Sequence, residues 1–208
     1  MNPLKNILRA AALAVTLLAA FTASAQSGAY ILDKVSSKAL AAKGITAKFK
    51  VSGAGQGLSG TMKMAGSKFT MQTPEGTTWF DGKTLWTLNP RTKEVTVTVP
   101  DAAELAEINP MTYLSGYKKQ YNVGTARRKD AALHFVVLNP KSRKAPVKAV
   151  EIGVSKKTMM PTYFHVRAND DSRVKVDLVS LSYSASHPAS TFTFPAAKYK
   201  DYEIVDLR

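Results

Sequence analysis

Cysteine is absent from the 208-residue sequence, and histidine occurs only three times. Without cysteine there are no disulfide bonds, no thiolate nucleophiles and no cysteine ligands for a metal. A membrane-anchored lipoprotein needs a cysteine directly after its cleavage site, so this route of anchoring is excluded too. An exported domain of this composition must be held together by its core alone.

Recognisable catalytic patterns are also missing. His134 and His165 fall in predicted strands and His187 in a predicted turn. No H-E-x-x-H, G-x-S-x-G or spaced set of metal ligands occurs. The acidic pair Asp170–Asp171 lies in a turn and is typical of a solvated loop. We therefore expect no enzymatic activity, no catalytic residues, no metal site and no cofactor.

Residues 1–25 have the pattern of a cleaved secretory signal peptide. Lys5 and Arg9 precede an apolar run over residues 10–21, and Ala23-Ser24-Ala25 is a small-residue cleavage site. An uncleaved anchor is the alternative, but the apolar run is short for a membrane span. We expect an exported, soluble protein with one domain over residues 26–208.

The chain is strongly basic, with a formal net charge of +14, of which Lys5 and Arg9 leave with the signal peptide. Nucleic acid is the usual partner of such a protein, but export argues against nucleic acid as a partner. An acidic membrane surface or an acidic protein is the alternative, as is solubility alone. The basic loop Lys141–Lys148 either docks on an acidic protein or membrane or is a solvated loop.

The stretch from Trp79 to Val99 predicts three short antiparallel strands. Asp81-Gly82 suits a hairpin turn, and Asn89-Pro90 opens a second turn. In the third strand the alternate residues from Val95 to Val99 are valines, with polar residues between them. This period of two indicates a sheet with one apolar face.

The same alternation recurs along most of the chain. A change of phase near Leu178 predicts a β-bulge, which would bend the sheet. Further strands are predicted over residues 45–52, 58–64, 68–72, 133–138, 150–154, 160–168 and 173–183. The last two segments that follow these in the chain are Phe192–Phe194 and Tyr202–Leu207.

Two regions are predicted to be helical. Apolar residues at three- and four-residue intervals indicate a helix over Ser27–Lys43, with Gly44 as its stop. Asp101 and Glu104 form a capping box that begins a short second helix. Pro110 fits the first turn of another. Each helix has an apolar stripe that must be buried.

Ten or more strands with one apolar face each cannot remain flat. We expect a mainly β fold with some α: an incompletely closed, strongly curved antiparallel β-barrel, with short helices forming a lid over its concave apolar face. Such an interior suits an apolar ligand, although the same side chains could be ordinary core. The predicted ligand-binding residues of the cavity and lid are Ile31, Val35, Phe49, Met62, Met64, Phe69, Met71, Trp79, Trp86, Leu88, Val97, Leu105, Ile108, Met111, Leu114 and Phe135.

The segment F-D-G-K-T-L-W-T-L-N-P, from Phe80 to Pro90, resembles the outer-membrane lipoprotein carrier proteins of the LolA family. The F-K-V strand at Phe49 and F-T-F-P over Phe192–Pro195 extend the resemblance. It implies a monomeric periplasmic shuttle for acylated lipoproteins. Such a shuttle accepts acyl chains from an inner-membrane ABC-type exporter and delivers them to an outer-membrane receptor, without nucleic acid.

The sequence departs from this family at one functional position. The best-studied members have an arginine that ties the lid shut, whereas the corresponding region here, Met64–Phe69, contains only Lys68 as a basic residue. What replaces that arginine stays open. A carrier of another lipid or isoprenoid, and an envelope interaction protein with a packed interior, are the alternative functions.

Overall fold

The computed structural model describes residues 27–53 and 57–208. The predicted signal peptide lies outside these residues. Within them, no helix is both long and apolar enough to cross a membrane.

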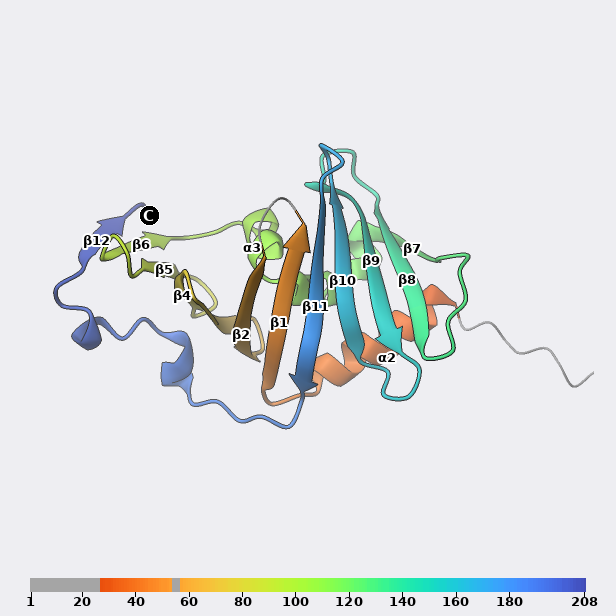
Figure 1. Ribbon diagram of the computed structural model, residues 1–208, viewed down its shortest axis with the longest axis horizontal. Helices are drawn as coiled ribbons and strands as arrows, with labels where there is room; N and C mark the ends of the chain where they lie inside the picture. The colour runs from red at the N-terminus through yellow and green to blue at the C-terminus, as the bar shows by residue number, and fades with distance from the viewer. Residues whose placement is uncertain (1–26, 54–56) are drawn as a thin grey trace, which may run out of the picture.

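The described residues form one sheet of twelve strands (Figure 1). Its strands are β1 (Ile45–Gly53), β2 (Leu58–Ala65), β3 (Lys68–Thr73), β4 (Gly76–Phe80), β5 (Leu85–Asn89), β6 (Glu94–Thr98), β7 (Tyr121–Thr125), β8 (Leu133–Pro140), β9 (Val147–Ser155), β10 (Pro161–Ala168), β11 (Arg173–Ser182) and β12 (Glu203–Asp206). Their order is β12-β6-β5-β4-β3-β2-β1-β11-β10-β9-β8-β7. β12 and β7 are its two free edges, so the sheet is not closed. The prediction of an incompletely closed sheet is confirmed.

Neighbouring strands are antiparallel except at one edge, where β12 runs parallel to β6. The predicted β-bulge is confirmed in β11. Lys48 pairs with Ser180 but Phe49 with Leu178, so Val179 has no partner on β1. The bulge restores the apolar face of β11 after its change of phase.

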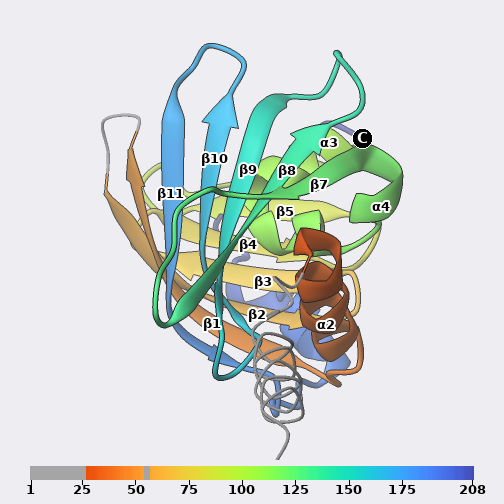
Figure 2. The same cartoon turned by 90° about the vertical axis from the view of Figure 1, so that its right-hand side faces the viewer.

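The helices are α2 (Gly28–Leu40), α3 (Ala102–Ile108) and α4 (Tyr117–Gln120), with 3₁₀ turns η2 (Pro110–Leu114), η3 (Ala189–Phe192) and η4 (Ala196–Lys198). In Figure 1, α2 and α3 lie behind the sheet, and Figure 2 shows the sheet curling so that β2–β5 pass behind β7–β10. The helix predicted to begin at Pro110 is the 3₁₀ turn η2. Phe192 ends η3, and β12 is the one strand after β11 in the described chain.

Local sequence explains where the helices begin. Ser27 Oγ accepts a hydrogen bond from the Tyr30 amide and caps α2. At α3, Asp101 Oδ1 accepts from the Glu104 amide at 2.9 Å, and Glu104 Oε2 accepts from the Asp101 amide at 2.8 Å. This is the predicted capping box.

Three groups of buried side chains make up the core. The helix cluster packs α2, through Ile31 and Val35, against β8–β10. The pocket cluster joins β1–β5 around Phe49, Met62, Met64, Phe69, Phe80 and Leu85. The tryptophan cluster consists of Trp79, Leu88 and Val95, with Trp86, Phe194, Tyr199 and Tyr202 against them.

Candidate functional site

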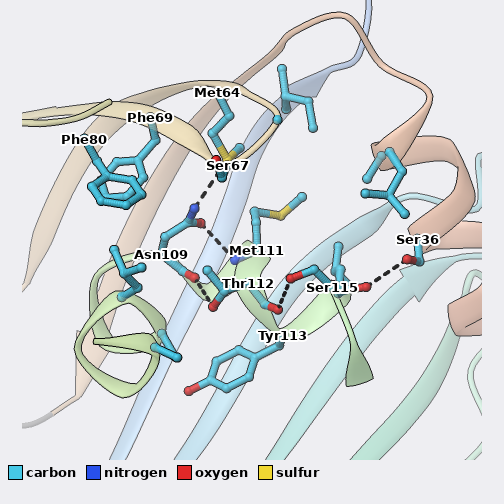
Figure 3. A pocket seen from close by; sticks show the side chains of 18 of the residues that line it. Ser36, Met64, Ser67, Phe69, Phe80, Asn109, Met111, Thr112, Tyr113 and Ser115 are labelled. Carbon is cyan, nitrogen blue, oxygen red and sulfur yellow. Dashed lines mark hydrogen bonds between the residues drawn. The ribbon is translucent and has the colours of Figure 1, made fainter. Parts of the chain in front are cut away.

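A partly enclosed pocket of about 340 Å³ lies between the curved sheet and the helical segments (Figure 3). The last turns of α2, the β2–β3 hairpin, α3 and η2 form its walls. The pocket therefore sits where the fold was expected to hold a lid over the concave face.

Apolar side chains from the sheet and from the lid face each other across this pocket. Phe69 and Phe80, on the paired strands β3 and β4, hold their ring centroids 5.4 Å apart. Met64 adds a thioether from β2, while Leu105 and Met111 approach from α3 and η2. Methionine side chains adapt to ligands of different shape because they are flexible and polarizable.

The lid of the pocket is formed by α3 and η2, and Asn109, which lies between them, connects this lid to the sheet. Its side chain is buried, Nδ2 donates to Met64 Sδ at 3.7 Å, and Oδ1 accepts from the Met111 amide at 3.0 Å. The Asn109 carbonyl also accepts from Thr112 Oγ1 at 2.7 Å. Figure 3 shows these bonds along one wall of the pocket. Asn109 thus caps η2 and contacts β2 through a weak sulfur acceptor.

A second set of bonds ties the lid to α2. Ser36 Oγ donates to the Leu114 carbonyl at 2.8 Å. Further along, Tyr117 Oη donates to Asp33 Oδ1 at 2.7 Å, and Lys118 Nζ lies 2.7 Å from the same oxygen. The hydrogen bond from Lys118, and then that from Tyr117, lower the pKa of Asp33. Burial, followed by the bond to Asp33, raises the pKa of Tyr117.

The pocket lining is electrically neutral. Its polar members are hydroxyl and amide side chains, among them Ser36, Asn109, Thr112 and Tyr121, and none of the described lining residues is charged. Burial raises the pKa of Tyr121, so its phenol ionises less readily than an exposed one. Such a lining favours an uncharged, largely apolar group, because an ion would lose its hydration without gaining a counter-charge.

The structure brings together five of the predicted site residues at the pocket: Met64, Phe69, Leu105, Met111 and Leu114. Four more predicted residues lie in or against the pocket cluster but do not line the pocket: Phe49, Met62, Met71 and Ile108. Ile31 and Val35 belong to the helix cluster under α2. A role in ligand binding stays a prediction for all of these residues.

The position expected for Trp79, Trp86, Leu88 and Val97 needs correction. These residues share one face of β4–β6, opposite the face that carries Phe80. The C-terminal segment covers them, with Phe194 5.5 Å from Trp79 between ring centroids. Because both faces of these strands are buried, apolar residues alone do not indicate the cavity side.

Phe135 also lies away from the pocket. Its neighbours Val136 and Leu138 are fully buried in the helix cluster, whereas Phe135 is half-buried beneath the Arg128 guanidinium, 4.0 Å from the ring centroid. Successive residues of a strand point to opposite faces. The pair Val136 and Leu138 thus provides the inner face of β8.

The sequence interpretation missed Ser36, Asn109 and Tyr121. Asn109-Pro110 did carry a signal, since asparagine before proline is a common cap at a helix start. Tyr121 begins β7, a strand that was not predicted individually. Ser36 and Ser37 are neighbours with no sequence feature that separates them.

Lys68 does not take part in the pocket. It is exposed at the start of β3, and Ala65, Gly66 and Ser67 of the preceding turn form the rim instead. Among the described residues, no group of three or more histidine, aspartate or glutamate side chains is arranged to hold a metal ion.

Comparisons with known proteins identify the family of the chain. Residues 18–170 match the family described as outer membrane lipoprotein carrier protein LolA. Comparison with curated protein sequences yields no match.

Among solved structures, the chain is similar to an uncharacterized conserved protein from Thermus thermophilus. The TM-score is 0.56 and the identity 14%, over 85% of this chain and 96% of that one. It is also similar to a LolA superfamily protein from Nitrosomonas europaea, with a TM-score of 0.45 and 10% identity, over 82% and 99% of the two chains. A putative outer membrane lipoprotein-sorting protein domain from Vibrio parahaemolyticus matches with a TM-score of 0.40 and 9% identity, over 81% and 97%.

Proposed function

The chain belongs to the outer membrane lipoprotein carrier protein family, and from this premise we propose that it is an exported periplasmic carrier of lipoproteins. It binds the acyl chains of a lipoprotein in the neutral pocket and carries them from the inner to the outer membrane. The single observation that supports this most is the uncharged, methionine- and phenylalanine-lined pocket beneath the helices.

Binding in this proposal is driven by burial of methylene groups. Each buried methylene contributes roughly 0.8 kcal/mol, so a single chain of ordinary length can be held firmly. The hydroxyl and amide groups on the wall offer hydrogen bonds to the carbonyl groups near the head of the chain. No covalent step is involved, and the protein acts as a monomer.

Release requires the lid to move. The lid is tied to the rest of the fold by a few bonds, chiefly Ser36 to Leu114 and Asn109 to Met64. Bonds of this kind contribute about 1 kcal/mol each, so an exporter or receptor that contacts the lid can shift its position. We propose an inner-membrane ABC-type exporter as donor and an outer-membrane receptor as acceptor.

The volume of the pocket favours a second candidate ligand. At about 340 Å³ it lies near the lower end of the range of roughly 300–1,000 Å³ for small-ligand pockets. One acyl or isoprenoid chain suits this size better than several chains together. A carrier of another lipid on the same fold is therefore the alternative.

Co-purification separates these functions. The chain, produced with its signal peptide in a bacterium that makes lipoproteins, should yield acylated protein fragments in mass spectra of the purified sample. A free lipid or isoprenoid in their place would support the alternative. A Met111→Trp variant, which fills the pocket, should lose the bound material, while Val179→Trp at the exposed bulge should retain it. Absence of any bound lipid, together with no binding of a fluorescent acyl probe, would refute both functions.

A further inference from the structure

A second cavity lies beside the first turns of α2 and shares no residue with the pocket. Its volume is about 1040 Å³, and it extends from α2 to the chain segment between β7 and β8 and to the β9–β10 turn. We call it the basic groove because lysines line it. Its principal residues are Ile31, Lys34, Lys129, Phe135, Lys156 and Met159.

The floor of the basic groove is apolar. Ile31 is 1% exposed and belongs to the helix cluster, and Met159 packs against that cluster. Phe135 and Leu133 contribute half-buried side chains from β8. The half-buried side chains of Leu133, Phe135 and Met159 offer apolar surface to a hydrocarbon chain, whereas Ile31 is too deeply buried to do so.

Its rim is cationic. Lys34, Arg128, Lys129 and Lys156 line the groove, against one carboxylate, that of Asp130. The carboxylate is already engaged, because its Oδ1 accepts from the amides of residues 132 and 133 at 2.7 and 2.9 Å. Lysine and arginine side chains on several sides of one cavity create a field that attracts an anion.

Two of the cations are held in position by the fold. Arg128 donates to Glu151 at 2.5 Å and to the Tyr163 hydroxyl at 2.7 Å, while lying over the Phe135 ring. Lys156 Nζ donates to the Asp130 carbonyl at 2.5 Å. Lys34 and Lys129 are exposed and line the groove from α2 and from the β7–β8 segment. These two lysines thus present ammonium groups to the groove from two different elements, and Lys34 Nζ lies 5.5 Å from the centroid of the Tyr30 ring.

We propose that the basic groove binds an anionic amphiphile, with its carboxylate or phosphate at Lys34 and Lys129 and its hydrocarbon chain on Leu133, Phe135 and Met159. A simple anion would make no use of the apolar floor, and a neutral lipid would make no use of the cationic rim. The site is independent of the carrier function, since it uses none of the residues of the pocket.

The test compares three probes on the full chain: a fluorescent fatty acid with a free carboxylate, its methyl ester and inorganic phosphate. A Met111→Trp background blocks the pocket, so that the remaining binding reports the groove. The fatty acid should bind there, weaken as salt is added, and lose affinity on the order of tenfold in K34E/K129E. The exposed pair R143E/K144E is the matched control for net charge and should bind as before.

A photoreactive fatty acid provides a second readout that needs no lysine variant, since in the folded Met111→Trp protein it should label peptides that contain residues 129–135. Equal binding of acid and methyl ester, or unchanged binding in K34E/K129E, would overturn the proposal. Phosphate that binds as tightly as the fatty acid would also overturn it, because the apolar floor would then contribute nothing.

Discussion

Trp79 and Phe80 are adjacent in β4, yet their side chains belong to different cores on opposite faces of the sheet. Phe80 packs on Phe69 at 5.4 Å and lines the pocket. Trp79 packs edge-on against Phe194 at 5.5 Å, under the C-terminal segment. This division decides which residues a bound ligand can touch.

Tryptophan fluorescence tests the division directly. Both tryptophans of the chain, Trp79 and Trp86, lie on the face away from the pocket. An acyl chain brominated near its end quenches tryptophan on contact, so we expect little quenching in the parent protein. A Phe80→Trp variant should be quenched strongly by the same ligand. Equal quenching of both proteins would place the ligand on the tryptophan face.

Removal of the aromatic cover should affect stability and not binding. Phe194 contacts Trp79 and stacks on Tyr199 with centroids 5.6 Å apart. Phe194→Ala should lower the free energy of unfolding by about 2 kcal/mol, less than for a fully buried phenylalanine because Phe194 is half-buried. Denaturant unfolding measures this change, with exposed Tyr30→Ala as control. A loss of acyl-probe affinity without a loss of stability would contradict the assignment.

Ser36 and Ser37 form a natural pair for testing the lid. Ser36 Oγ donates to the Leu114 carbonyl, whereas Ser37 is exposed on the next position of α2. Ser36→Ala should cost about 1 kcal/mol and speed the release of a bound acyl probe. Ser37→Ala should change neither quantity. Stopped-flow exchange of the probe measures the rates, and identical rates for the two variants would exclude this bond from lid closure.

Asn109 is expected to stabilise the closed lid more than any exposed asparagine. Asn109→Ala removes the cap of η2 and the contact with Met64. The expected cost is about 1–2 kcal/mol, with faster hydrogen exchange of residues 111–114. Asn122→Ala, on the exposed side of β7, is the control. Unchanged exchange over residues 111–114 would show that Met64 and Asn109 do not hold the lid.

The link between α4 and α2 should depend on pH. The bonds from Lys118 and Tyr117 lower the pKa of Asp33 below its ordinary value of 3.8. A carboxyl with a lowered folded pKa stabilises the fold above its unfolded pKa and loses this effect as pH falls through the folded value. Asp33→Asn should therefore reduce the melting temperature at neutral pH, and the difference should shrink below about pH 3.8. A constant difference down to the most acidic pH would contradict this.

The sequence alone was sufficient for most of the local structure, although β7 was not predicted individually. The period of two predicted most strands, because alternate side chains of a strand share a face. The change of phase near Leu178 located the bulge at Val179, and Asp101 with Glu104 located the start of α3. These features depend on residues within a few positions of one another.

Which face of each strand lines the pocket was decided only in the tertiary structure. Alternation requires that Trp79 and Phe80 point in opposite directions, but it does not say which direction is concave. That choice depends on the curvature of the sheet and on residues 192–202, more than 100 positions along the chain, which cover the tryptophans. The same limit applies to Phe135 and Val136, since both faces of β8 carry apolar residues. Local patterns thus determined the strands and turns, and long-range packing determined the site.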